Sequence, residues 1–530
     1  MPQLPTNKIA PMAAAVTAAL CSNSPVFAQS DGEQALLEEV IVTARKRTES
    51  VQDIPVSIQS LSENDLKEMG ARGLADYSRF VPSVNVVSYG NGSSTLVFRG
   101  ANVNAGGYVV QGTSSMYLDE ISVTATGSQP SIRMVDIARV EALSGPQGTL
   151  YGSDAQAGTL RVITNKPVMN EFGAVVDAQI RGMEEGEDSY DGSVVLNLPL
   201  IDDKLALRVV GFKAKDGGYI DNVLGHTPDV GLGNYTDLPS GWGTLDNSHA
   251  VEDDWNDSEV EGWRASLLWQ INDDWSATAS YLHQNTESGA YSDFDPNVGD
   301  LETIRFNDEF RNDEYDLYSL TIEGDLGFAQ LISATGYFER EIEQTLDNTV
   351  YAHYWAAYYC RVLEGVDPAV YYWYYELPEG GTAGWRDLSY CGATTVEGDF
   401  LTAYDYPQTV ERFTQEFRLS AQGETLDWLV GLYYEKTDEY WQADFAYPTI
   451  NGSTPGETAN PWGQSVSKGF NEWRYGLEDD RLVNGKEWWY SENTPEWEQF
   501  AVFGEATWHA TEKLDVTLGL RYFDRSNEFV

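Results

Sequence analysis

Histidines are the first residues to test for metal or acid-base chemistry, because imidazole is a common zinc ligand and general base. The chain has five: His226, His249, His283, His353 and His509. No two of them stand in an H-E-x-x-H spacing or in a comparable ligand spacing. Carboxylates are so abundant that no acid-base pair is distinguished by its position. The sequence therefore predicts no zinc enzyme.

A group of oxygen ligands between residues 293 and 302 matches a calcium loop only in part. Its members are Asp293, Asp295, Asn297, Asp300 and Glu302. An EF-hand loop needs a glycine where Val298 stands and a bidentate acid where Ile304 stands. We expect a hydrated loop here, and a calcium site is the alternative.

Glycine-rich segments give no sign of a phosphate-binding loop. Residues 90–92 and 231–233 begin like dinucleotide loops, but both lack the third glycine and the strand-to-helix context. The sequence also contains neither G-x-x-x-x-G-K-[ST] nor G-x-S-x-G. We therefore expect no enzyme, no catalytic residue, no cofactor and no resident metal.

The chain is strongly acidic, with 33 Lys and Arg against 83 Asp and Glu, a net charge of −50. This balance excludes nucleic acid, which is bound by neutralising phosphates. The acidity either solvates long exposed loops or attracts a cationic or metal-bearing ligand. Mean hydropathy is −0.38, and no run of about 18 apolar residues could form a membrane helix. Any membrane must therefore be crossed by strands, and the 16 Trp and 31 Tyr residues suit aromatic girdles at two interfaces.

The N-terminus predicts export. Residues 1–28 combine Lys8, a short apolar stretch and a small residue, Ala28, at the end, as in a cleaved secretory signal peptide. A lipoprotein cut before Cys21 is the alternative, although Leu20 is large for the position before a lipidated cysteine. In an oxidising compartment, Cys360 and Cys391 could close one loop by a disulfide. Two free buried thiols are the alternative.

The most informative motif runs from Arg139 to Pro167 and combines four glycines with an alternating strand. It resembles the end of the plug domain of TonB-dependent outer-membrane receptors. The matching residues are Gly145, Pro146, Leu150, Tyr151, Gly152, Ala155, Gly158, Val162, Thr164 and Pro167. Two positions depart from the family pattern. Ser144 replaces an arginine that usually pairs with barrel carboxylates, and Ala157 replaces the first of two glycines.

The rest of residues 50–167 predicts a compact mixed domain. We expect a strand over 54–58, a helix that begins after Ser62 and stops at Gly70, and strands over 84–87, 95–100 and 116–119. Arg99 and Gly100 match the last two residues of the family motif I-R-G. Glu120 occupies the position of the glycine in the family motif Y-x-D-G. The resemblance thus extends in order over most of residues 38–167, the plug being 50–167.

A short apolar strand follows the expected cleavage site. It contains Glu39, Val40, Ile41, Val42, Thr43 and Ala44. The resemblance implies that this is a TonB box, which adds as a strand to a periplasmic energy-transducing protein. An ordinary first strand is the alternative from the residues alone. We assign residues 29–49 to the box and its linker.

Residues 168–530 predict amphipathic strands near 172–182, 189–199, 204–215, 258–271, 275–286, 313–325, 328–342, 410–421, 426–438, 498–510 and 514–525. Tight turns alternate with very long connections, as in outer-membrane barrels with periplasmic turns and extracellular loops. About eleven strands is half of the 22 found in plugged transporters. We therefore expect a partial barrel, from a fragment or a truncated gene product.

Two groups of residues are candidates for the transported ligand and for contacts with the barrel. The aromatic loop residues Tyr354, Trp355 and Trp373, with Tyr108 in an upper plug loop, could stack on a ligand. A girdle or packing within the loop explains the aromatic residues equally well. Arg99, Arg139 and Glu141 could form ion pairs to the barrel or within the plug.

Together these observations predict a mainly β protein with an N-terminal mixed α/β plug and an antiparallel transmembrane β-barrel. The resemblance implies an energy-coupled receptor in the outer membrane of a Gram-negative bacterium, by family default for a ferric siderophore or other iron complex. Uptake of an oligosaccharide, haem or cobalamin, or a passive pore or adhesin-like barrel, is the alternative. The expected partners are a TonB-type protein, outer-membrane lipid and lipopolysaccharide, and a small-molecule or metal-complex ligand. We expect a monomer.

Overall fold

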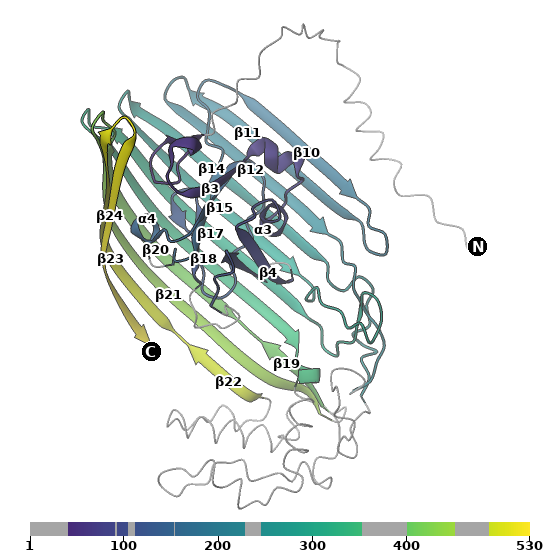
Figure 1. Cartoon of the computed structure of the whole chain (residues 1–530). Helices are drawn as coiled ribbons and strands as arrows, with labels where there is room; N and C mark the ends of the chain where they lie inside the picture. Colours follow the sequence, from purple (N-terminus) through teal and green to yellow (C-terminus); the bar gives the residue numbers. More distant parts are fainter. Residues whose placement is uncertain are drawn as a thin grey trace, which may run out of the picture.

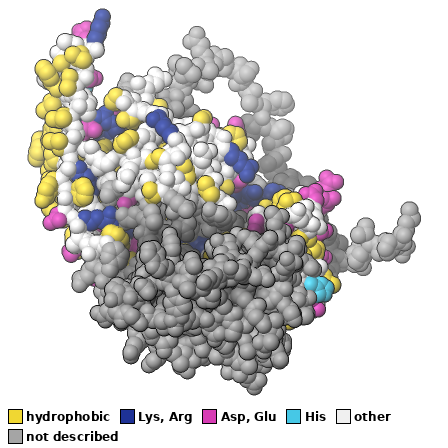
Figure 2. All heavy atoms as spheres, turned by 60° about the horizontal axis from the view of Figure 1, so that its bottom comes forward, with side chains coloured by type: hydrophobic (Ala, Val, Ile, Leu, Met, Phe, Trp, Pro, Cys, Tyr) yellow, Lys and Arg dark blue, Asp and Glu magenta, His cyan; other side chains and the backbone are white. Residues whose placement is uncertain are grey.

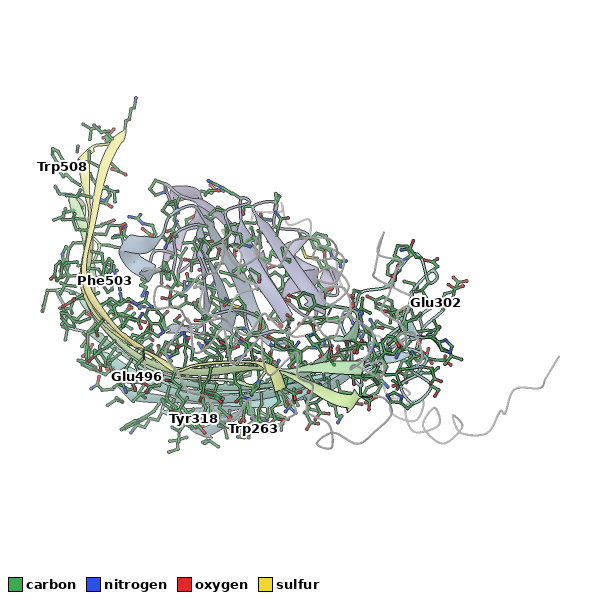
Figure 3. All side chains as sticks on the ribbon, turned by 90° about the horizontal axis from the view of Figure 1, so that it is seen from below. Trp263, Glu302, Tyr318, Glu496, Phe503 and Trp508 are labelled. Atoms are coloured by element: carbon green, nitrogen blue, oxygen red, sulfur yellow. The ribbon has the colours of Figure 1, made fainter. Side chains whose placement is uncertain are left out.

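A computed structural model describes residues 41–90, 93–103, 112–152, 154–227, 245–351, 400–450 and 487–529. A large curved antiparallel sheet surrounds one side of a smaller inner unit formed by residues 41–167 (Figure 1). Seen from below, the sheet is an arc, and the inner unit lies on its concave side (Figure 3). Among the described residues, no helix is long and apolar enough to span a bilayer.

Within the described ranges the curved sheet has thirteen strands. They are β10 (Gly173–Arg181), β11 (Ser189–Ile201), β12 (Leu205–Asp216), β14 (Ser258–Asn272), β15 (Trp275–Ser288), β17 (Phe310–Asp325), β18 (Gln330–Asp347), β19 (Phe400–Asp405), β20 (Gln408–Ala421), β21 (Leu426–Ile450), β22 (Glu487–Asn493), β23 (Pro495–Thr511) and β24 (Leu514–Phe529). Both β19 and β20 pair with β18 and β21, and both β22 and β23 pair with β21. Counting each of these two pairs as one strand leaves eleven positions, which confirms the predicted number. Within the described residues β10 and β24 are the two edges, and the sheet does not close.

In each strand, successive side chains point alternately toward the inner unit and away from it. Sequences whose side chains alternate in character can therefore satisfy both surroundings as strands. On β24, the outward residues Val516, Leu518, Leu520 and Tyr522 are 47–70% exposed. Trp263 and Tyr318 also lie on the convex side (Figure 3). Figure 2 shows hydrophobic side chains gathered along the edge formed by β23 and β24. This apolar outer surface is the kind that faces lipid in a membrane barrel.

Connection lengths differ between the two ends of the sheet. Residues 202–204, 273–274, 326–329, 422–425 and 512–513 make tight turns at one end. Long connections, including 217–257, 289–309 and 348–399, leave from the other end. Two of the long connections meet where β13 (Asp221–Asn222) pairs in parallel with β16 (Glu302–Thr303). The predicted separation of short turns from long loops is confirmed.

The inner unit is built on a five-stranded sheet with the order β3-β8-β9-β6-β7. Its strands are β3 (Ser57–Ser62), β6 (Ser114–Leu118), β7 (Ile121–Ser122), β8 (Ile137–Ser144) and β9 (Gly158–Thr164). The remaining elements are β1 (Ile41–Val42), β2 (Glu49–Ser50), the 3-10 helix η1 (Val51–Asp53), the hairpin β4 (Val84–Gly90) and β5 (Ser93–Phe98), and the helices α2 (Glu63–Glu68), α3 (Leu74–Ser78) and α4 (Gly148–Tyr151). Its core includes Met116 and Leu160 and continues into Leu317 and Phe338 of the curved sheet. The two parts therefore share one hydrophobic core.

The predicted helix of this unit is confirmed, whereas the predicted strands have different ends. The strands expected over 95–100 and 116–119 end at Phe98 and Leu118, because residues of positive φ follow. Ser62 caps α2 through a capping box with Asp65, and Gly70 follows the helix at φ 63°. The strand expected over 54–58 instead begins at Ser57. Pro55 has no N–H to donate to a partner strand, so the pairing begins after it.

Candidate functional site

The glycine-rich turn between β8 and β9 is shaped by backbone requirements at two positions. Gly145 and Gly152 have φ values of 95° and 88°, a region that L side chains rarely adopt. The Gly145 N–H donates to the Ala157 carbonyl over 2.9 Å, which closes the turn. Ala157 is not among the residues with positive φ, so the family's glycine is not needed there. Ser144 is buried in β8 between Ser57 and Gly158.

The turn places Tyr151 against the N-terminal segment of residues 41–49. In this segment β1 and β2 form a two-stranded hairpin, and the Tyr151 hydroxyl donates to the Ala44 carbonyl over 2.7 Å. Val42 and Ala44 are fully buried, whereas Ile41 is 44% exposed. The segment is therefore packed against the inner unit and leads outward at Ile41.

Thr43 is held by three charged side chains of the inner unit. Its N–H donates to Glu141 Oε1 over 2.9 Å, and its carbonyl accepts from Arg161 Nη1 over 2.6 Å. Its hydroxyl accepts from Arg139 Nη2 over 3.0 Å. All three contacts break if the segment is pulled away, so they tie the position of Thr43 to β8 and β9.

Arg161 connects this segment to the curved sheet. Its side chain pairs with the fully buried Glu141 over 2.9 Å and with Glu120 over 3.2 Å. Glu120 in turn pairs with Arg418 of β20 over 2.6 Å. A continuous chain of charge-assisted hydrogen bonds therefore runs from Thr43 to the sheet wall.

The basic triplet Arg45-Lys46-Arg47 makes a second, direct connection to the wall. Arg45 pairs with Glu505 of β23, and Lys46 pairs with Glu416 of β20. Lys46 Nζ also lies 5.2 Å from the centroid of the Tyr151 ring. Burial lowers the pKa of Lys46, while the Glu416 carboxylate opposes that shift. The triplet is thus enclosed between the inner unit and the sheet.

The family model of the TonB-dependent receptor plug domain matches residues 50–159. The chain carries the plug domain of the TonB-dependent outer-membrane receptors. The inner unit is that plug, and the curved sheet is the barrel wall. Its location is accordingly the outer membrane of a Gram-negative bacterium.

The chain is also similar in sequence to curated relatives and shares its fold with a solved structure. The pesticin receptor of Yersinia pestis is 29% identical over 213 residues, which is 39% of this chain and 30% of that protein. The vitamin B12 transporter of Vibrio vulnificus is 36% identical over 150 residues, 27% of this chain and 24% of that protein. The crystal structure of the ferric yersiniabactin uptake receptor from Yersinia pestis shares the fold, with a TM-score of 0.60 and 17% identity over 90% of this chain and 60% of that one. The matches to the two curated relatives thus span less than a third of their length. The family consists of transport receptors and not of enzymes.

The structure places the predicted plug residues in different surroundings. Arg139 and Glu141 pair with each other over 2.8 Å inside the plug, which is the second of the two alternatives for these residues. Arg99 is exposed, and Gly100 follows it in the same turn with φ 75°. Pro146 lies in the turn after Gly145. Glu120 and Arg418 supply a contact to the barrel that the motif did not identify.

Several candidates lie outside the described residues. These are residues 1–28, Glu39, Val40, Tyr108, Tyr354, Trp355, Trp373, Cys360 and Cys391. The loop considered for calcium is described, and two of its acids have protein partners. Asp295 accepts from the Asn297 N–H over 2.8 Å, and Asp293 pairs with Arg305 over 2.6 Å.

One group of possible metal ligands was missed because it forms across strands. His283 of β15 lies opposite Asp316 of β17, with 3.1 Å between Nδ1 and Oδ1, and Glu314 is 3.9 Å away. These residues face outward on the barrel wall. No short sequence motif indicates the group, since His283 and Asp316 are 33 positions apart in the chain.

Replacing Gly158 with alanine should destabilise the plug by about 1–3 kcal/mol. An added Cβ would lie 2.4 Å from the buried Phe98 ring and 2.7 Å from the Leu143 carbonyl oxygen. Amide hydrogen exchange in β9 would measure the change. Gly148→Ala is the control, because a Cβ there meets nothing within 4 Å. Equal exchange in the two variants would contradict the packing role of Gly158.

Proposed function

We propose that this chain serves energy-coupled uptake of a scarce solute, by family default a ferric siderophore or another iron complex. In this proposal a TonB-type periplasmic protein engages residues 38–44 by strand addition, whose affinity comes from main-chain hydrogen bonds. Tension on this segment would be passed to the plug and to the barrel wall. No covalent chemistry is required.

The observation that carries the proposal is the position of Thr43 and the basic triplet. Thr43 is bonded to Glu141 and Arg161 in the plug, and Lys46 pairs with Glu416 in the wall. These contacts are polar and can be exchanged for water when the segment is pulled. Val42 and Ala44 would leave a small apolar cluster at the same time, so the release also has an apolar cost. A passive pore has no need for a plug that shares its core with the wall.

Cobalamin is the second candidate ligand, and the specific observation in its favour is the 36% identity to a vitamin B12 transporter. Siderophore uptake is favoured by the named function of the matched structure. Both ligands fit the same coupling mechanism, so the mechanism can be tested before the ligand is known.

The test is binding of a purified periplasmic TonB domain to the full chain in detergent micelles, with and without residues 38–44. We expect saturable binding that is lost on deletion. Deletion of residues 29–35, which has the same length, is the control and should leave binding unchanged. Equal binding by all three proteins, or none by the undeleted chain, would overturn the proposal and favour a passive barrel.

A further inference from the structure

A cavity of about 620 Å³ lies between the plug and the barrel wall. The plug contributes α3 and its flanking residues, and the wall contributes the ends of β10, β12 and β14. These are the strand ends from which the long connections leave. On the proposed function, this side faces the outside of the cell.

The cavity concentrates positive charge in a chain that is otherwise strongly acidic. Its lining includes four arginines, Arg72, Arg79, Arg133 and Arg181, against two carboxylates, Asp76 and Asp216. The chain as a whole has 83 acids and 33 bases. A surplus of cations in a partly enclosed space raises the local concentration of anions.

The four arginines outnumber their carboxylate partners by one, because Arg133 also pairs with Asp191 and Arg72 also lies 3.8 Å from Asp76. Arg133 lies 3.3 Å and Arg181 3.0 Å from Asp216, which also pairs with Arg72. Burial lowers the pKa of Arg133, and the neighbouring Arg72 and Arg181 act in the same direction, while Asp216 opposes them. A second anion in the cavity would relieve this repulsion.

Arg72 and Arg181 face open space, unlike the arginines that only brace the barrel. Arg72 and Arg181 are 35% and 31% exposed, whereas Arg340 in the wall is fully buried on Asp313. Ser88, Ser94, Ser131, Ser258 and Ser292 add hydroxyl groups to the lining. The surface thus offers hydrogen bonds and positive charge, which suits oxygen-rich anions better than apolar ligands.

We propose that this cavity binds a small, oxygen-rich anion carrying carboxylate or phosphate groups, so that the solute taken up is anionic. The inference rests on the proposed function for its direction of approach. Guanidinium groups recognise both of these anions by paired hydrogen bonds.

The test is calorimetric titration of the full chain in detergent micelles at low ionic strength. Citrate and inorganic phosphate are the anionic probes, and sucrose is the neutral one. We expect saturable binding of at least one anion, weakening as salt is added, and none of sucrose. Arg79→Ala should weaken anion binding at least about tenfold, while Arg79→Lys, which keeps the charge, should lose less.

Lys67→Ala is the matched control, because Lys67 is an exposed cation on α2 that does not line the cavity. It should leave anion binding unchanged. Equal weakening by Lys67→Ala and Arg79→Ala, equal binding of sucrose, or no binding of either anion would overturn the inference. The TonB-domain experiment needs no ligand, so retained TonB binding with absent anion binding would refute this inference alone.

Discussion

Replacing Arg161 with methionine should open the N-terminal segment and destabilise the plug by about 3–5 kcal/mol, the usual cost of removing one partner from a buried ion pair. Arg161 is 1% exposed, and its guanidinium serves Thr43, Glu141 and Glu120 at once. Without it, the fully buried Glu141 keeps Arg139 and the Thr43 N–H but loses one of its two arginines, and the Thr43 carbonyl loses the Arg161 donor. Methionine fills similar space but supplies no donor.

Amide hydrogen exchange of residues 41–47 measures this effect. Loss of about 3 kcal/mol corresponds to exchange faster by more than about a hundredfold, if these amides exchange by local opening. Arg161→Lys should give an intermediate result, since lysine keeps the charge but cannot reach three acceptors in one plane. Lys67→Met is the surface control. Unchanged exchange at Thr43 in Arg161→Met would show that the segment is held by Lys46 and Tyr151 instead.

The barrel strands could be predicted because the membrane imposes the same alternation on each of them. The predicted strand ends are less accurate where the strands continue past the apolar outer surface. The strand predicted over 426–438 continues to Ile450, and the one predicted from 313 begins at Phe310. Beyond Tyr318 on β17, the outward positions are Asp316, Glu314 and Asn312, which are polar. Such residues remain hydrogen-bonded in the sheet but no longer show an apolar alternation.

The coupling contacts could not be predicted, because they join residues that are distant in the chain. Arg418 and Glu120 are 298 positions apart, and Lys46 and Glu416 are 370 apart. The sequence did mark Glu120 as a departure from a glycine position, but gave no partner for it. Arg161 is the one charged residue in the strand TLRVIT, and that single charge was the one available signal. A buried charge needs a counter-charge, yet only the fold determines which one.

Raising the pH from about 5 to about 7.5 should lower the free energy of unfolding through Glu309, by on the order of 3 kcal/mol. This residue ends the long connection before β17. Burial raises the pKa of Glu309 to about 7 from 4.5, with Arg305 opposing and Asp347 adding to the shift. Oε1 accepts from the Asp347 N–H over 2.9 Å, while Oε2 is buried without a hydrogen-bond partner among the described residues.

Between pH 4.5 and 7 the folded chain therefore holds a proton on Glu309 that the unfolded chain has released. The stabilising effect of that proton is fully present below pH 4.5 and is lost as the pH rises through 7. Glu309→Gln should remove this part of the pH dependence, because glutamine stays neutral and can keep the bond to Asp347. Urea titrations at several pH values, followed by tryptophan fluorescence in micelles, would measure the slope. Asp308→Asn changes the adjacent, exposed carboxylate and should leave the slope intact; the same slope in Glu309→Gln would place the proton on another group, with Asp347 the next to test.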